Sequence, residues 1–236
     1  VAGNLKIYDS TLASSNGQAI TLSGSWLNSG NYTGTGTVTF DGTNQTLSGN
    51  TVFNNLTKSV TTADTLYFDF RARQSVSGAL TMNGADSQLL SLRSTKTGSA
   101  AYLMLDGDAG SQSITYVDVQ DNDASGGAAL NGGATSTDSG NNTNWLIPVT
   151  RTWTGGGTDG NCSTGANWGG TAPNSGDSIV IGAAQKDIIW DGSCPGTLSG
   201  FIIQNTFTGS VTLAVNLDLS GNFSLRAGTF NQDNYT

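Results

Sequence analysis

The chain has 236 residues, with nine Lys and Arg against 17 acidic residues, a formal net charge of −8 and a pI of about 4.1. Every acidic residue is Asp, and the sequence contains neither Glu nor His. Without an imidazole, a Ser-His-Asp or Cys-His nucleophile system and a His-containing zinc site are excluded. The few cations are scattered, so no basic stripe is available for a phosphate backbone and nucleic acid is not an expected partner.

The composition predicts an all-β protein with almost no α-helix. Gly (33), Ser (27), Thr (32) and Asn (22) make up nearly half of the chain. The absence of Glu and the scarcity of Lys, Arg and Met remove good helix formers, while Thr, Gly and Asn favour strands and turns. Apolar runs are only a few residues long, far short of a bilayer crossing, so no membrane span is expected.

A short phrase recurs along the chain: an apolar-x-apolar strand, then a polar residue, then Gly. Such a phrase is typical of a strand that runs into a tight turn. Gly24 and Gly42 are the closest pair of these glycines, and the larger gaps approximate multiples of about 21 residues, the length of one solenoid coil. Six copies occur, at residues 20–24, 38–42, 80–84, 103–107, 188–192 and 217–221.

These coils predict a parallel β-helix, or β-solenoid, in which each rung stacks about 4.8 Å above the last. Alternation sends one set of side chains inward. The alternative is a pair of tandem antiparallel β-sandwiches, which also use short alternating strands; the coil-sized period favours the solenoid. The expected core includes Leu80, Met82, Leu90, Leu92, Leu103, Leu105, Val117 and Val119.

We expect a boundary between two modules near residue 148. It follows the polar, turn-rich stretch 136–144, and a different sequence pattern, rich in Trp and Gly, begins with Arg151 and Trp153. Residues 1–148 then form a solenoid segment that ends one module. Residues 149–236 start the next, with a Trp- and Gly-rich opening suited to capping a hydrophobic stack. Its rungs would continue into residue 1 of a neighbouring unit.

The two cysteines, Cys162 and Cys194, both lie in turn-like contexts. We expect a disulfide between them rather than two unpaired buried thiols. A disulfide favours an oxidising compartment, and therefore an extracellular or periplasmic address.

Four stretches carry a resemblance to a known class of protein: TVTFDGTNQTLSG (37–49), LLSLRS (89–94), YVDVQD (116–121) and TDSGNNTNW (137–145). They resemble phrases of the tandem modules in very large bacterial surface proteins, and residues 153–181 are similar to the opening of the next such module. The resemblance implies an extracellular, cell-surface β-solenoid that is adhesin-like or fibre-forming, with no known catalytic site.

The ends of the chain share the pattern Gly-Asn-apolar-x-apolar, at residues 3–7 and 221–225. If the last residue ran directly into the first, the spacing of these two phrases would equal that of Gly24 and Gly42, which is one coil. We therefore expect copies to stack head to tail, as a homopolymer or a tandem array. The residues expected at this contact are Leu5, Ile7, Phe223, Leu225, Phe230 and Tyr235.

Aspartates supply oxygen ligands of the kind that calcium prefers, but solvated turn aspartates are the preferred interpretation and no cofactor is expected. The candidates are Asp106, Asp108, Asp118, Asp121 and Asp123.

Two other function classes compete with the structural one. A carbohydrate-binding module would use Trp26, Tyr32, Trp153 or Trp168 as stacking platforms for surface glycans, unless these rings are buried. A polysaccharide-degrading β-helix enzyme would need paired aspartates beside a sugar groove, but the aspartates here lie mostly in turn phrases. The sequence thus predicts a non-enzymatic structural repeat module of a surface fibre or giant adhesin.

Overall fold

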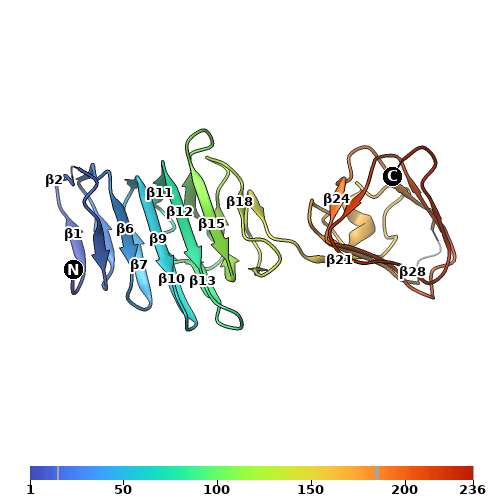
Figure 1. Cartoon of the computed structure of the whole chain (residues 1–236), viewed down its shortest axis with the longest axis horizontal. Helices are drawn as coiled ribbons and strands as arrows, with labels where there is room; N and C mark the ends of the chain where they lie inside the picture. Colours follow the sequence, from blue (N-terminus) through green and yellow to red (C-terminus); the bar gives the residue numbers. More distant parts are fainter. Residues whose placement is uncertain (15, 184–185, 236) are drawn as a thin grey trace. The chain divides into compact units, whose positions relative to one another are not determined.

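The computed structural model describes residues 1–14, 16–183 and 186–235. The chain divides into two compact units, Val1–Ile147 and Pro148–Thr236, called unit 1 and unit 2 below. Both are parallel β-solenoids, with about ten turns in total (Figure 1). The short 3-10 helix η1 (Gly165–Trp168) is the only helix in the described residues. The all-β solenoid prediction is confirmed.

Unit 1 has three faces, and the first is a seven-stranded sheet in which each strand pairs with the next coil's strand (Figure 1). Its strands are β1 (Leu5–Ile7), β4 (Trp26–Asn28), β7 (Gln45–Ser48), β10 (Asp64–Phe68), β13 (Leu90–Ser94), β16 (Val117–Gln120) and β19 (Thr137–Asp138).

The second and third faces of unit 1 follow the same coil-to-coil order. The second face consists of β2 (Thr11–Leu12), β5 (Asn31–Tyr32), β8 (Thr51–Phe53), β11 (Arg73–Val76), β14 (Ala101–Leu105) and β17 (Asn122–Asp123). The third consists of β3 (Ile20–Leu22), β6 (Thr37–Phe40), β9 (Asn55–Ser59), β12 (Ala79–Asn83), β15 (Ser111–Thr115), β18 (Leu130–Asn131) and β20 (Trp145–Leu146).

Unit 2 repeats this arrangement with fewer coils. Its first face holds β21 (Thr150–Trp153), β22 (Ser178–Ile181), β25 (Gly200–Ile203) and β28 (Phe223–Leu225). Its second face holds β23 (Ile188–Trp190), β26 (Ser210–Leu213) and β29 (Thr229–Asn231), and its third holds β24 (Thr197–Leu198) and β27 (Asp218–Leu219).

Every pairing between the named strands is parallel, which excludes the antiparallel sandwiches. Coil length differs between places, because the step along the chain from Leu5 to its partner Trp26 is longer than the step from Ile20 to its partner Val38. The turns absorb these differences, so inward-facing positions still stack on inward-facing positions.

The core of each unit is a column of inward-facing apolar side chains. All eight residues predicted for the core of unit 1 are buried, with at most 1% exposure. Burial alternates along the strands, as in β13 and β14. This confirms the alternation from which the core was predicted.

The Gly of the repeated phrase is explained by close approach between stacked turns. A Cβ at Gly42 would lie 1.9 Å from the carbonyl oxygen of Ser23 in the preceding coil. At Gly107, which occupies the same place in another copy of the phrase, nothing lies within 4 Å. The phrase therefore marks a steric requirement at some corners and only a turn preference at others.

Substitution of these two glycines should separate the two cases. We expect Gly42→Ala to destabilise unit 1 by about 1–3 kcal/mol, because the new methyl group must displace backbone of the neighbouring coil. Gly107→Ala is the matched control and should leave the midpoint of urea unfolding nearly unchanged. Equal midpoints for both variants would contradict the steric explanation.

Candidate functional site: the terminal coils

Large hydrophobic side chains are exposed mainly at the first coil of unit 1 and the last coil of unit 2. Within the described part of the chain, eight are exposed, and five of these belong to the two terminal coils. The five are Val1, Tyr8, Phe223, Leu225 and Tyr235. Exposed apolar side chains that gather in one place often mark an interaction surface.

The last coil of unit 2 is an open end of the apolar column. Phe223 stands opposite Phe201, and Leu225 stands opposite Ile203 in the coil below. Phe201 and Ile203 are fully buried, so Phe223 and Leu225 point along the same inward direction. They are 43% and 46% exposed, and no further coil lies over them among the described residues.

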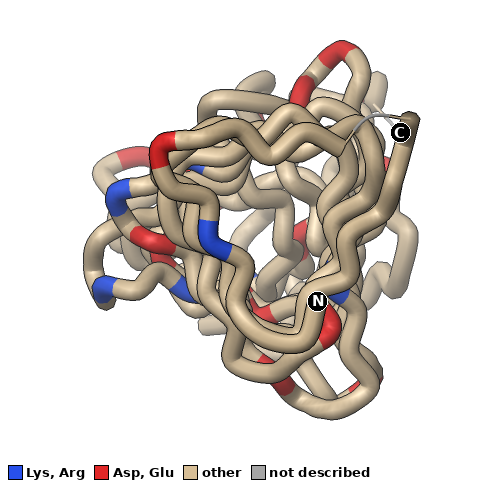
Figure 2. Tube along the Cα trace, turned by 90° about the vertical axis from the view of Figure 1, so that its left-hand side faces the viewer, with Lys and Arg blue, Asp and Glu red and all other residues tan. Residues whose placement is uncertain are grey.

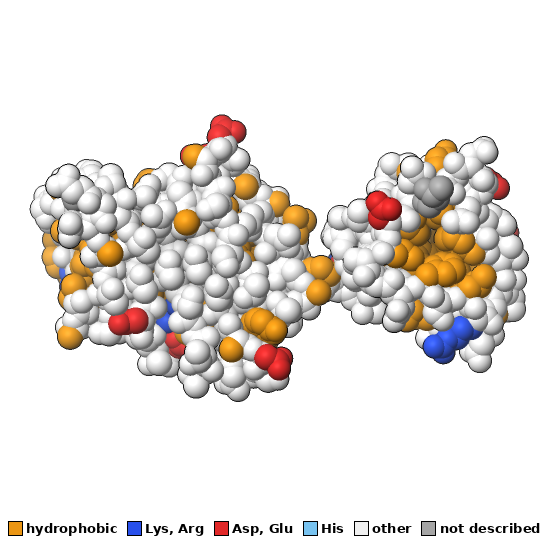
Figure 3. Space-filling model, in the orientation of Figure 1, with side chains coloured by type: hydrophobic (Ala, Val, Ile, Leu, Met, Phe, Trp, Pro, Cys, Tyr) orange, Lys and Arg blue, Asp and Glu red, His pale blue; other side chains and the backbone are white. Residues whose placement is uncertain are grey.

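Aromatic contacts organise this open end. The rings of Phe223 and Phe230 have centroids 4.8 Å apart, and Phe201 lies 5.8 Å from Phe230. Together with leucines they form an apolar hollow, visible as the orange depression in unit 2 (Figure 3). Its lining is Leu213, Leu217, Leu219, Phe223, Phe230 and Gln232.

The first coil of unit 1 presents the opposite end of a column. Leu5 pairs with Trp26 and is partly buried, whereas Ile7 is 4% exposed. On the second face, Leu12 pairs with Tyr32 and is also partly buried. The three side chains line a shallow outward-opening surface. Figure 2 shows the N-terminus at this end and the charged residues scattered around the trace.

The residues predicted for assembly thus fall into two groups on separate units. Leu5 and Ile7 lie in the first coil of unit 1. Phe223, Leu225 and Phe230 lie in the last coil of unit 2, and Tyr235 follows in a turn closed by its N–H to the Gln232 carbonyl (2.8 Å).

Sequence reasoning missed Leu12 and Leu219, which also face these surfaces. Leu219 belongs to one of the repeated phrases, so the repeat was a signal that could have found it. Leu12 carries no such signal, because its strand has only two residues.

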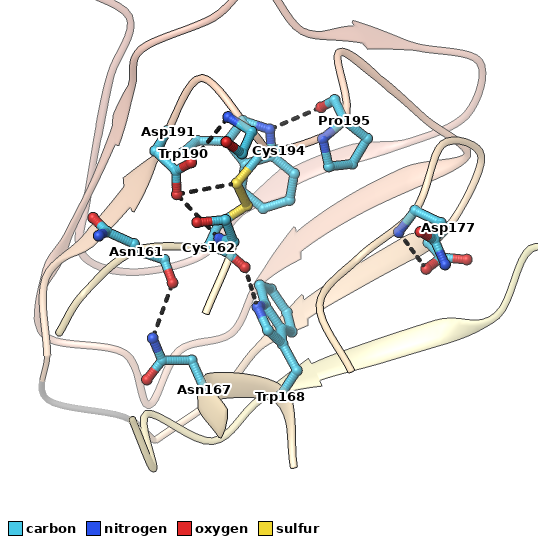
Figure 4. The surroundings of a disulfide bond; sticks show 12 residues. Asn161, Cys162, Asn167, Trp168, Asp177, Trp190, Asp191, Cys194 and Pro195 are labelled. Atoms are coloured by element: carbon cyan, nitrogen blue, oxygen red, sulfur yellow. Dashed lines mark hydrogen bonds between the residues drawn. A yellow bond between two sulfur atoms is a disulfide. The ribbon is translucent and has the colours of Figure 1, made fainter. Parts of the chain in front are cut away.

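The first coil of unit 2, in contrast, is covered by aromatic packing around η1. Trp168 packs edge-on against Trp153 and Trp190, with centroids 5.0 and 6.3 Å away. Its indole N–H donates to the Cys162 carbonyl at 2.7 Å (Figure 4). The fully buried Asn167 amide donates to the carbonyl of Asn161 at 2.9 Å, which ties the loop in place.

The disulfide joins Cys162 to Cys194, as predicted, with the Cα atoms 6.1 Å apart (Figure 4). Cys162 lies beside β23, because its N–H donates to the Ile189 carbonyl, and Cys194 follows that strand. The bond therefore links neighbouring coils of unit 2. Both residues are buried, at 0% and 8% exposure.

Asp191 lies beside the disulfide and accepts N–H groups from Ser163 and Ser193, each at 3.0 Å. Burial alone would raise the pKa of Asp191, but these backbone donors hold the pKa below its ordinary value. Cys162, Asp191 and Cys194 form the only close Cys/Asp group in the described residues. With the two sulfurs bonded to each other, the group lacks the thiolate donors that a metal would need.

Removal of the disulfide should destabilise unit 2 alone. The bond closes a loop across 32 residues, for which the chain-entropy model gives about 3–4 kcal/mol. We expect the double variant Cys162→Ala/Cys194→Ala to lower the melting temperature of unit 2 in calorimetry. Thiol titration of unfolded, unreduced wild-type chain should find no free thiol; two thiols per chain would contradict the disulfide.

Four of the five calcium candidates have carboxylates engaged in local contacts, and the five form no close group in the described residues. Asp106 accepts the Asp108 N–H at 3.0 Å, and Asp123 accepts the Ser125 N–H at 2.8 Å. Asp118 pairs with Arg93, and Asp121 accepts the Asn141 amide at 2.6 Å. These contacts use the carboxylates of Asp106, Asp118, Asp121 and Asp123 as acceptors at turns and corners, and the expectation that no cofactor binds stays a prediction.

The alternative of surface aromatic platforms is wrong for all four residues proposed. Trp26 and Trp153 are 0% and 2% exposed, and Tyr32 and Trp168 are 5% and 7% exposed. Trp26 and Tyr32 pack against each other inside unit 1, with ring centroids 5.0 Å apart. These four rings are therefore core side chains and not surface stacking platforms.

Comparisons with family models, with curated proteins and with solved structures give no match to this chain. No helix among the described residues is long and apolar enough to cross a membrane. The fold defines the protein as a two-unit parallel β-solenoid.

Proposed function

We propose that this chain is an extracellular structural repeat module of a bacterial surface fibre or giant adhesin. Its copies stack head to tail through their terminal coils, and it acts by assembly rather than by catalysis. The observation that carries the proposal is the open apolar end of unit 2, where Phe223 and Leu225 continue the core column but remain nearly half exposed.

Two physical effects favour the stacking of another coil on this open end. An uncovered terminal strand presents backbone N–H and C=O groups that readily pair with another strand. The inward side chains of β28 would lose contact with water when another coil stacks on them, a gain of roughly 25 cal/mol per Å² of apolar surface.

The proposed extracellular location rests on the disulfide and on the composition. A buried disulfide between coils is typical of proteins that fold in oxidising compartments. Glycans are an additional proposed partner of the assembled surface. With the four candidate rings inside the cores, no specific observation favours a separate carbohydrate-binding module.

The test is the assembly state of purified chain at increasing concentration. We expect sedimentation velocity to show a growing series of species, and electron microscopy to show thin filaments with an axial repeat. A chain that stays strictly monomeric at millimolar concentration, with its disulfide intact, would overturn the proposal.

A further inference from the structure

We propose that unit 1 binds a polysaccharide that carries carboxylate groups, at a site centred on Arg73 on the outer side of the second face. The inference rests on the proposed role at a cell surface and deepens it, because it names the class of glycan and the residues that bind it. The site lies in the coils that contain β8, β11 and β14.

Two neighbouring corners between the first and second faces are longer than the path of the solenoid requires. The corner before β8 consists of residues 49–50, whereas the corners before β11 and β14 consist of residues 69–72 and 95–100. The two longer corners contact each other, because the Phe70 N–H donates to Thr95 Oγ1 at 3.3 Å. We call them together the corner ridge. Segments that the fold does not need for its path are often the ones that carry binding residues.

Cations gather at the corner ridge, although the chain as a whole has a net charge of −8. The cationic groups of Arg71 and Lys96 each lie 5.0 Å from the centroid of the Phe70 ring. The guanidinium of Arg73, the first residue of β11, lies 4.2 Å from the centroid of the Tyr102 ring in the next coil. Three of the nine Lys and Arg residues thus lie in two successive coils, where aromatic rings hold them by cation–π contacts.

The carboxylates beside the corner ridge have other partners. Asp69 accepts the Arg71 N–H at 3.1 Å and forms an ion pair with the Arg71 side chain. Asp121 is 4% exposed and accepts a backbone N–H from the corner ridge at 2.9 Å. Arg73 and Lys96 form no ion pair within the described part of the chain. These two cations are therefore available to an anionic ligand.

Arg73 is the better placed of the two to bind a carboxylate. Its side chain is exposed, and its position is fixed by the Tyr102 ring and by an N–H from Nη1 to Met104 Sδ at 3.7 Å. A side chain that is already ordered loses less conformational freedom on binding. The remaining guanidinium N–H groups form a planar fork, which matches the two oxygens of a carboxylate.

A shallow hollow adjoins Arg73 at the surface of the second face. Asn31, Asn50 and Ser75 contribute to its lining, and Arg73 is the only charged residue among those that line it. Amide and hydroxyl side chains both donate and accept hydrogen bonds, which suits the hydroxyl groups of a sugar. A sugar carboxylate in this hollow would meet Arg73 and no charge of its own sign. These features favour a uronate-containing polysaccharide over a neutral one.

Binding to a polyuronate tests the site. Chains are tethered sparsely to a biosensor surface, so that copies cannot stack on one another, and soluble polygalacturonate is passed over them. The matched ligand is the same polymer with its carboxylates methyl-esterified. We expect the polyuronate to bind, the ester not to bind, and added salt to weaken the binding.

Arg73→Gln should weaken polygalacturonate binding by about tenfold, because a charge-assisted hydrogen bond to the carboxylate is lost. Its melting temperature should stay unchanged, because Arg73 is exposed. Arg226→Gln is the matched control: Arg226 is an exposed arginine of unit 2 that also forms no ion pair within the described residues, and this variant should bind like wild type.

Three results would overturn the proposed site: equal binding of the methyl ester, an equal loss in both variants, or tighter binding of dextran sulfate or of a single-stranded oligonucleotide at equal charge. The last result would indicate general attraction of anions. Absence of binding by chains that still assemble in solution would overturn the site and leave the proposed function standing. Binding by chains that never assemble would overturn the proposed function and leave the site standing.

Discussion

Leu225→Asp is expected to abolish end-to-end assembly while leaving the monomer folded. In the single chain Leu225 is 46% exposed, so the carboxylate can stay hydrated and the melting temperature should change little. In the junction the same carboxylate would be buried against Ile7 of the next copy without a counter-ion, which is strongly unfavourable. Sedimentation velocity should show only monomer at concentrations where wild-type chain forms long species.

Val52→Asp is the matched control, because Val52 is also an exposed aliphatic residue, at 61%, but lies on the outer side of β8. We expect this variant to assemble like wild type. Loss of assembly in both variants would indicate a general effect of added negative charge rather than a terminal-coil contact.

A corresponding substitution in the first coil of unit 1 would separate the effect on assembly from the effect on folding less well. Ile7 is already 4% exposed within its own coil, so Ile7→Asp would destabilise the first coil even in the monomer. Substitutions of the partly buried Leu5 lie between these cases. The open end of unit 2 is therefore the better place to separate assembly from folding.

The coil period and the inward alternation could be predicted from the sequence because both depend on local pattern. Phrases such as residues 38–42 combine an alternating strand with a Gly that stacked turns require. The three-sided path could not be predicted in the same way, because coils of different length coexist and the corners carry no fixed signature.

The residues of the two terminal coils could also be predicted from local sequence pattern, but only in part. The matching phrases at residues 3–7 and 221–225 indicate the first face of each terminal coil. Leu12 and Val1 belong to the other faces, and their places depend on hydrogen bonds to strands of the next coil. Such pairings become visible only once the coils are stacked.

Inward-facing polar residues were also hidden from sequence reasoning. Lys58 occupies the inward position two residues after the buried Leu56 in β9, and its side chain is fully buried at the corner between the third and first faces. Its ammonium group lies 2.7 Å from an Asp64 carboxylate oxygen and donates to the Gly42 carbonyl at 2.7 Å and to Gln45 Oε1 at 3.0 Å. The side chain thus spans several segments of neighbouring coils.

This buried ion pair leads to the second large expected effect. Asp64→Asn should destabilise unit 1 by about 3–5 kcal/mol, because it leaves the Lys58 ammonium buried without its counter-ion. Asp69→Asn is the control: Asp69 pairs with Arg71, whose side chain is 74% exposed, and its loss should cost less than about 1 kcal/mol. Urea unfolding of the two variants gives the comparison.

The same pair predicts how stability changes with pH. Burial would raise the pKa of Asp64, but the hydrogen bond from Lys58 and the backbone N–H groups of Asn44 and Thr65 hold the pKa below its ordinary value of 3.8. A carboxyl with a lowered folded-state pKa contributes stability above its unfolded pKa and loses it as the pH falls through the folded value. Wild-type unit 1 should therefore lose stability below about pH 4. Asp64→Asn, which has no such carboxyl, should show a smaller loss over the same range; an equal loss would assign the acid sensitivity to other aspartates.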